Sequence, residues 1–127
     1  MNYDVIIIGA GPGGIFAAYE LMQHKPDLKV AVFEAGHALD KRRCPIDGEK
    51  IKSCVNCKSC SIMSGFGGAG AFSDGKYNIT NDFGGTLYEY IGKKQALELM
   101  HYVDEINLQY GGEGTKLYPT AGSRFKT

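Results

Sequence analysis

The sequence has no surplus of charge of either sign. Lys and Arg together number 14, and so do Asp and Glu, in a chain of 127 residues. A balanced chain gives no electrostatic reason to expect nucleic acid or an anionic membrane surface as a partner. We therefore expect the partner to be a small-molecule substrate or an electron partner. The composition identifies neither this partner nor the oligomeric state.

Long hydrophobic runs are also missing. No apolar stretch approaches the roughly 20 residues of a transmembrane helix, and the apolar run Val5–Ile8 is too short for the hydrophobic region of a signal peptide. A chain of this length buries roughly two-thirds of its unfolded surface, which is enough for one domain with a core. The sequence therefore predicts a cytoplasmic protein of one domain.

The chain begins with the pattern of a βαβ unit in an α/β fold. Val5–Ile8 is a β-branched run typical of a central strand covered on both faces, Ile15–Gln23 predicts a helix, and Lys29–Phe33 predicts a second strand. Glu34 ends the second strand at the distance of about 20 residues expected of a ribose-binding acid. Between the first strand and the helix, three glycines have the spacing G-x-G-x-x-G: Gly9, Gly11 and Gly14.

This glycine spacing suits the pyrophosphate of a dinucleotide. Gly9 permits a tight turn, Gly11 lets the backbone approach the pyrophosphate, and Gly14 lets the helix pack closely on the strand. The anion would lie at the helix N-terminus, where Pro12 suits an early position because it has no N–H. Glu34 would accept hydrogen bonds from the adenosine ribose and repel a 2′-phosphate, so the site should disfavour NADP. FAD and NAD present the same ADP half to this motif, so an NAD-binding module without flavin chemistry stays open.

Two stretches of the sequence resemble known flavoproteins. The opening DVIIIGAGPGGIFAAYEL, continued by VAVFEAG, resembles the N-terminal FAD-binding segment of the glutathione-reductase-like flavoproteins. The stretch KRRCPIDG, the cysteine group and GFGGAGAFSDGK are similar to a group of bacterial FAD-dependent dehydrogenases of the FAD/NAD(P)-binding oxidoreductases. The resemblance implies a Rossmann-like fold of three layers around a parallel sheet. It also implies an oxidoreductase with FAD as cofactor and NAD(P)H as a candidate electron donor.

The resemblance further implies which residues hold the cofactor, although it names no catalytic residue. It places the FAD pyrophosphate at the glycine turn, the ribose at Glu34, and a phosphate or the adenine at Arg43. A basic loop that is only solvated is the alternative for Arg43. The expected cofactor-binding residues are Gly9, Ala10, Gly11, Pro12, Gly13, Gly14, Glu34, Ala35 and Arg43.

Members of such families run to several hundred residues, so we expect residues 1–127 to be the N-terminal part of one FAD/NAD(P)-binding domain with an incomplete sheet, inactive alone. Residues 1–36 would form the βαβ motif, 37–80 a Cys- and Gly-rich insertion, and 81–127 a helical segment. Apolar residues at helical spacing predict a packing helix in the last segment, which Gly111 ends in the left-handed conformation. The predicted apolar face comprises Ala96, Leu99, Met100, Val103, Ile106 and Tyr110.

All the cysteines lie in the expected insertion, at the spacing C-x9-C-x2-C-x2-C. They are Cys44, Cys54, Cys57 and Cys60. The spacing favours a four-thiolate site for an iron–sulfur cluster or zinc, although the Cys-Pro of the ferredoxin pattern follows its triplet whereas Cys44 precedes it. Thiol–disulfide exchange and inert reduced thiols are the alternatives. If the cysteines serve electron flow, they should lie on the flavin side of the fold.

A second glycine cluster follows the cysteines. Gly65–Gly70 would let a backbone pass close to FAD, and a flexible loop without a ligand is the alternative. Asp74-Gly75 predicts a hairpin turn that joins residues 71–73 to Lys76–Ile79. A nucleotide-triphosphate loop is excluded here because Tyr77 stands where the magnesium-binding Ser or Thr is required.

Overall fold

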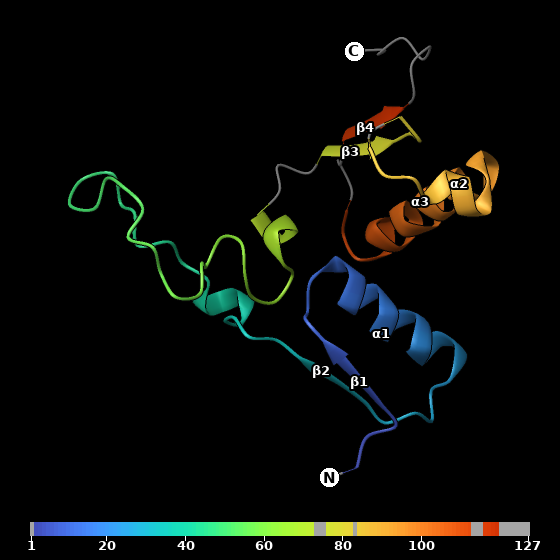
Figure 1. Ribbon diagram of the computed structural model, residues 1–127, viewed down its shortest axis with the longest axis horizontal. Helices are drawn as coiled ribbons and strands as arrows, with labels where there is room; N and C mark the ends of the chain where they lie inside the picture. The colour runs from blue at the N-terminus through green and yellow to red at the C-terminus, as the bar shows by residue number, and fades with distance from the viewer. Residues whose placement is uncertain (1, 73–75, 83, 113–115, 120–127) are drawn as a thin grey trace. The chain divides into compact units, whose positions relative to one another are not determined.

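The computed structural model describes residues 2–72, 76–82, 84–112 and 116–119 (Figure 1). The chain divides into two compact units, Met1–Ser73 and Asp74–Thr127. Each unit has its own small parallel sheet and its own helices, so the protein is of the α/β class.

The first unit begins with the predicted βαβ motif. Strand β1 (Val5–Ile8) leads into helix α1 (Pro12–His24), which returns the chain to strand β2 (Val30–Phe33). The two strands pair in parallel, with Val5 opposite Val30. The helix begins three residues earlier than predicted, because the fixed φ of Pro12 suits the first helical position.

Only one face of this sheet is covered in the part of the chain that the structure describes. A Cβ added at Gly14 of α1 would lie 3.3 Å from Cγ2 of Ile7, so α1 packs over the face that Ile7 occupies. On the opposite face, Ile6 is 57% exposed and Ile8 is 81% exposed. The expectation of a strand covered on both faces is therefore wrong for the described residues, since β1 pairs with β2 alone and carries a single helical layer.

The segment after β2 is irregular and contains two short 3-10 helices, η1 (Leu39–Lys41) and η2 (Ala69–Phe72). The prediction of a hairpin at the end of this segment is wrong for the first strand, because Ala71 and Phe72 belong to η2. The turn residues Asp74 and Gly75 lie outside the described part of the chain. The second arm, β3 (Lys76–Ile79), does form a strand, but it pairs in parallel with β4 (Lys116–Pro119) instead of antiparallel with residues 71–73.

The second unit packs two helices beside this β3–β4 sheet. Helix α2 (Leu87–Ile91) contacts α3 (Lys93–Gln109), and α3 contacts β3. The predicted packing helix is confirmed, and its end follows the expected chemistry: Gly111 has a φ of +93°, and the N–H of Gly112 donates to the carbonyl of Asn107 at 2.7 Å. None of the helices described is long and apolar enough to cross a bilayer.

The predicted apolar face of α3 is only partly buried. Ala96 and Ile106 are buried, whereas Tyr110 is exposed at the end of the helix. Between β3, α2 and α3 lies an apolar cavity of about 250 Å³. Its lining residues are Asn78, Ile79, Leu87, Ala96, Leu99, Met100 and Val103. The spacing therefore identifies the inward face correctly, but the packing against it is loose.

The substitution Gly14→Ala tests the contact between α1 and the turn before it. The new methyl group would collide with the carbonyl oxygen of Gly9, so we expect the free energy of unfolding to fall by about 1–3 kcal/mol. Gly13→Ala is the matched control, because a Cβ there meets no atom within 4 Å and alanine favours a helix by about 1 kcal/mol. Chemical denaturation followed by circular dichroism measures both, and equal losses would contradict the predicted contact.

Candidate functional site

The glycine turn between β1 and α1 has the geometry of an anion-binding turn. Gly9 has a φ of +97°, a conformation that other residues rarely adopt. Helix α1 begins directly after it, so the N–H groups of its first turn have no carbonyl partner within the helix. A Cβ added at Gly13 would meet no atom within 4 Å, so the space beside Gly13 is open, whereas Gly68 lies against Gly11 and Pro12. An anionic group can therefore approach these N–H groups and the positive end of the helix dipole.

Glu34 is hydrogen-bonded to this turn. One carboxylate oxygen, Oε2, accepts the N–H of Ala10 at 2.7 Å, and the other, Oε1, accepts the N–H of Gly36 at 2.8 Å. The bond from Ala10, followed by that from Gly36, lowers the pKa of Glu34 below its ordinary value of 4.5. Each oxygen of an ionised carboxylate has a further lone pair. Glu34 therefore stays ionised and can still accept a hydrogen bond from a ligand hydroxyl.

A cavity of about 730 Å³ opens beside Glu34. This volume falls within the range of roughly 300–1,000 Å³ typical of small-molecule sites. The residues that line the cavity are Glu34, Ala35, His37, Cys57, Lys58, Ser59, Ser61 and Ser64. Two residues predicted to bind the cofactor, Glu34 and Ala35, thus face one space, whereas Arg43 is exposed and does not line it.

Ala10 is placed differently from the expectation. Its side chain is buried, and both of its backbone groups already have protein partners. The N–H donates to Glu34, and the carbonyl accepts the N–H of Gly67 at 2.8 Å. Ala10 therefore connects the turn to the ribose-binding candidate and to the glycine-rich segment, instead of offering a free group to a ligand.

The second glycine cluster lies against the first. A Cβ added at Gly36 would lie 2.5 Å from the backbone nitrogen of Gly65, and one added at Gly68 would lie 3.1 Å from Cα of Gly11. No side chain fits at these positions without a shift of the backbone. The close approach that we expected toward FAD is thus made, at these positions, toward the protein's own backbone. Hydrogen bonds also hold the segment to Ala10 and to His37.

The residue that holds this segment in place is Arg42, which the sequence pattern did not single out. Its side chain is only 3% exposed, and its guanidinium lies 4.9 Å from the ring centre of Phe72. It donates to four backbone carbonyls at 2.7–2.9 Å, those of Ser61, Ile62, Phe66 and Gly68. Arg42 and Arg43 are adjacent and chemically identical in the sequence, so no pattern in KRR indicates which of them is buried.

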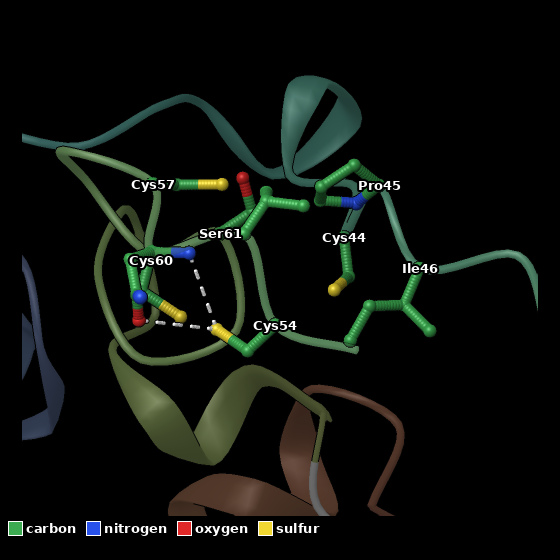
Figure 2. Close-up of a pocket in the computed structure, with 9 residues that line it drawn as sticks. Cys44, Pro45, Ile46, Cys54, Cys57, Cys60 and Ser61 are labelled. Atoms are coloured by element: carbon green, nitrogen blue, oxygen red, sulfur yellow. Dashed lines mark hydrogen bonds between the residues drawn. The ribbon is translucent and has the colours of Figure 1, made fainter. Parts of the chain in front are cut away.

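The four cysteines surround a second cavity, of about 230 Å³, in the same unit (Figure 2). All four are exposed free thiols. Backbone N–H groups of Met63 and Ile62, and then the charge of Arg42, lower the pKa of Cys60. Among the residues that the structure describes, no three Cys, His, Asp or Glu side chains are arranged as ligands of a single metal ion. The four thiols are therefore gathered as expected, but they line a cavity and are not arranged as the ligands of a single metal ion.

Cys57 connects the two cavities. It lines the cysteine cavity and also the cavity beside Glu34. Ser61 is likewise shared by both. The thiols therefore lie next to the residue predicted to bind the adenosine ribose.

Comparisons with known proteins match mainly the βαβ region. The model of the Thi4 family matches residues 1–40. An uncharacterised protein of Clostridium beijerinckii is 41% identical over 71 residues, which are 56% of this chain and 13% of that protein. The thiamine thiazole synthases of Yarrowia lipolytica and Schizosaccharomyces pombe are 60% and 49% identical over 35 residues, which are 28% of this chain and 11% of each enzyme. No solved structure matches.

These likenesses support a flavin-related, Rossmann-type N-terminal portion. The Thi4 family is linked with FAD binding, and the named relatives are enzymes. The chain spans only 13% and 11% of the length of the relatives named above. The matches do not extend to the narrower glutathione-reductase-like group that the sequence resembles.

The substitution Arg42→Met tests whether this side chain holds the glycine-rich segment. It would leave four carbonyls without their donor, so we expect the free energy of unfolding to fall by about 3 kcal/mol and cleavage by protease between residues 60 and 72 to accelerate. Arg43→Met is the matched control and should change stability by less than about 0.5 kcal/mol, because Arg43 is exposed. Similar losses in both variants would contradict the assignment.

Glu34 should contribute to acid sensitivity. Its pKa is lower in the folded chain than in the unfolded chain, so its ionised form stabilises the fold above the ordinary value of 4.5. This stabilisation is lost as the pH falls through the folded value. We expect Glu34→Gln to flatten the decrease in unfolding free energy below pH 4.5, measured by denaturation at several pH values. Glu49→Gln, at an exposed site, is the control and should leave that decrease unchanged.

Proposed function

We propose that this chain is the N-terminal portion of an FAD-dependent oxidoreductase, a dehydrogenase, and that it binds the ADP half of FAD. The observation that carries the proposal is the hydrogen bond from Ala10 to Glu34, which joins the glycine turn to a carboxylate at the end of β2. This bond supports the proposal, because the ADP half of a dinucleotide requires an anion-binding turn next to an acceptor for the ribose hydroxyls. FAD would supply the hydride or electron transfer, while the chain supplies binding and orientation.

The pyrophosphate is assigned to the start of α1. The N–H groups of Gly13 and Gly14 lie in the first turn of α1 and have no carbonyl partner within the helix, and Pro12 at the first helical position has no N–H to offer. The open space above Gly13 is the room that a phosphate group needs. The φ of Gly9 and the contact of Gly14 with Gly9 fix the turn before the helix.

The adenosine is assigned to the cavity beside Glu34. Both carboxylate oxygens accept one backbone N–H and retain capacity for the ribose hydroxyls. The negative charge of Glu34 opposes a 2′-phosphate at the same place. Lys58 lines this cavity, so it is a nearer candidate than Arg43 for contact with a phosphate or the adenine.

The substrate side of the reaction is assigned to parts of the parent protein outside the described residues. The resemblance to FAD/NAD(P)-binding oxidoreductases supports NAD(P)H as the electron donor, and the partner is a small-molecule substrate or an electron partner that the resemblance does not name. The likeness to the thiazole synthases covers the dinucleotide-binding segment, so it supports a shared cofactor and not a shared reaction.

Ligand binding to the purified chain tests the proposal. We expect FAD and ADP to bind, and 2′,5′-ADP to bind at least ten-fold more weakly than ADP, because Glu34 faces the ribose. Glu34→Gln should lower the ratio of the ADP affinity to the 2′,5′-ADP affinity at least three-fold, and Glu49→Gln should not change this ratio. Titration calorimetry gives the affinities. Binding of NAD⁺ without binding of FAD would instead support the NAD-binding module and contradict the flavin assignment.

A further inference from the structure

The cysteine cavity is built from two separate stretches of chain. Cys44 comes from the loop after η1, and the other three thiols come from a C-x2-C-x2-C run (Figure 2). The rest of the lining is mostly apolar, with Pro45, Ile46 and Val55 among its residues. Cys44 lies ten residues before Cys54 in the sequence, so packing brings it to the cavity that the other three cysteines line.

The size of the cavity argues against a single ion. Zinc binds sulfur at about 2.3 Å in a tetrahedron, which brings the four sulfur atoms to within roughly 3.8 Å of one another and leaves no space between them. Within the described ranges, no three such side chains are arranged to hold one ion, and the cavity that the four cysteines line measures about 230 Å³. A cavity of this volume has room for an occupant larger than one ion.

The spacing of the cysteines matches one such occupant. In two-cluster ferredoxins, the Cys-Pro at the end of each C-x2-C-x2-C-x3-C-P run ligates the cluster held by the other run. One of the two clusters therefore takes its Cys-Pro from a stretch that precedes its triplet. The order in this chain, with Cys44-Pro45 before the triplet, is the order of that cluster. Within a single ferredoxin run the Cys-Pro follows the triplet, whereas Cys44-Pro45 precedes it here. The two orders agree when the comparison is made with the four ligands of one cluster, which come from both runs.

The stretch of chain that carries the cysteines is basic. Residues 41–60 hold six basic side chains against two acidic ones in a chain whose total charge is zero, and four thiolates around an iron–sulfur cluster carry net negative charge. Backbone N–H groups also point at the sulfur atoms: that of Asn56 donates to Sγ of Cys54 at 3.4 Å, and that of Met63 to Cys60. Hydrogen bonds to cluster sulfurs are one of the means by which proteins tune these centres.

We propose that this cavity binds one [4Fe–4S] cluster, with one thiolate on each iron. The ligands are Cys44, Cys54, Cys57 and Cys60. The proposal does not depend on flavin binding. Given the function proposed above, Cys57 further places the cluster beside the adenosine end of the FAD site.

Metal and sulfide analysis tests the site. The full chain is purified without oxygen, incubated with sulfide and equal amounts of ferrous and ferric iron, which supply the two oxidation states of the assembled cluster, and desalted. We expect about four irons and four acid-labile sulfides per chain, with an electron paramagnetic resonance signal after reduction. Cys44→Ser and Cys57→Ser should each lower the iron content at least five-fold. Ser61→Ala is the matched control, because Ser61 lines the same cavity without a thiol, and it should keep the full content.

Three results would overturn the proposal: one zinc per chain without sulfide, a wild-type chain that holds no metal after reconstitution, or equal iron in the cysteine variants and the wild type. Circular dichroism checks that the variants fold. If they do not fold, the iron and sulfide content of the wild-type chain decides whether a cluster is bound. Flavin is measured in the same sample. A cluster without flavin binding would contradict the proposed function while supporting this site.

Discussion

Two glycine-containing stretches, residues 9–14 and 64–70, lie backbone against backbone, and this contact positions the candidate sites of the first unit. Gly68 approaches Gly11, and the N–H of Gly67 donates to the carbonyl of Ala10. The contact persists because the buried Arg42 donates to two carbonyls of the second stretch, those of Phe66 and Gly68, and to two carbonyls just before it, those of Ser61 and Ile62. A charged donor that pairs with several carbonyls offsets the cost of its own burial. The packing thus depends on one guanidinium and on the absence of side chains.

The same contact explains why the two cavities adjoin. Once the glycine-rich stretch is held on the turn, the cysteine triplet that precedes it lies beside the end of β2. Cys57 and Ser61 then line the space next to Glu34 as well as the cysteine cavity. The glycine turn and a group of thiols, 30 or more residues apart in the sequence, become neighbours through packing.

The first unit also leaves apolar surface that its own described residues do not cover. Ile6 and Ile8 are exposed on the face of the sheet opposite α1. Parallel sheets are usually covered on both faces. The matched relatives are longer than this chain. In proteins of that length, a further layer of structure usually covers the second face of a parallel sheet.

Local sequence rules determined the βαβ motif, the left-handed Gly9, the close packing of Gly14 and the end of α3 at Gly111, because each depends on neighbours within a few residues. They failed for the predicted hairpin, since the pairing of β3 with β4 joins residues about 40 positions apart. The sequence also determined the number and spacing of the cysteines. Only the tertiary structure decided that Arg42 and not Arg43 is buried, and that four thiols enclose one cavity, because burial and enclosure depend on which distant backbones meet.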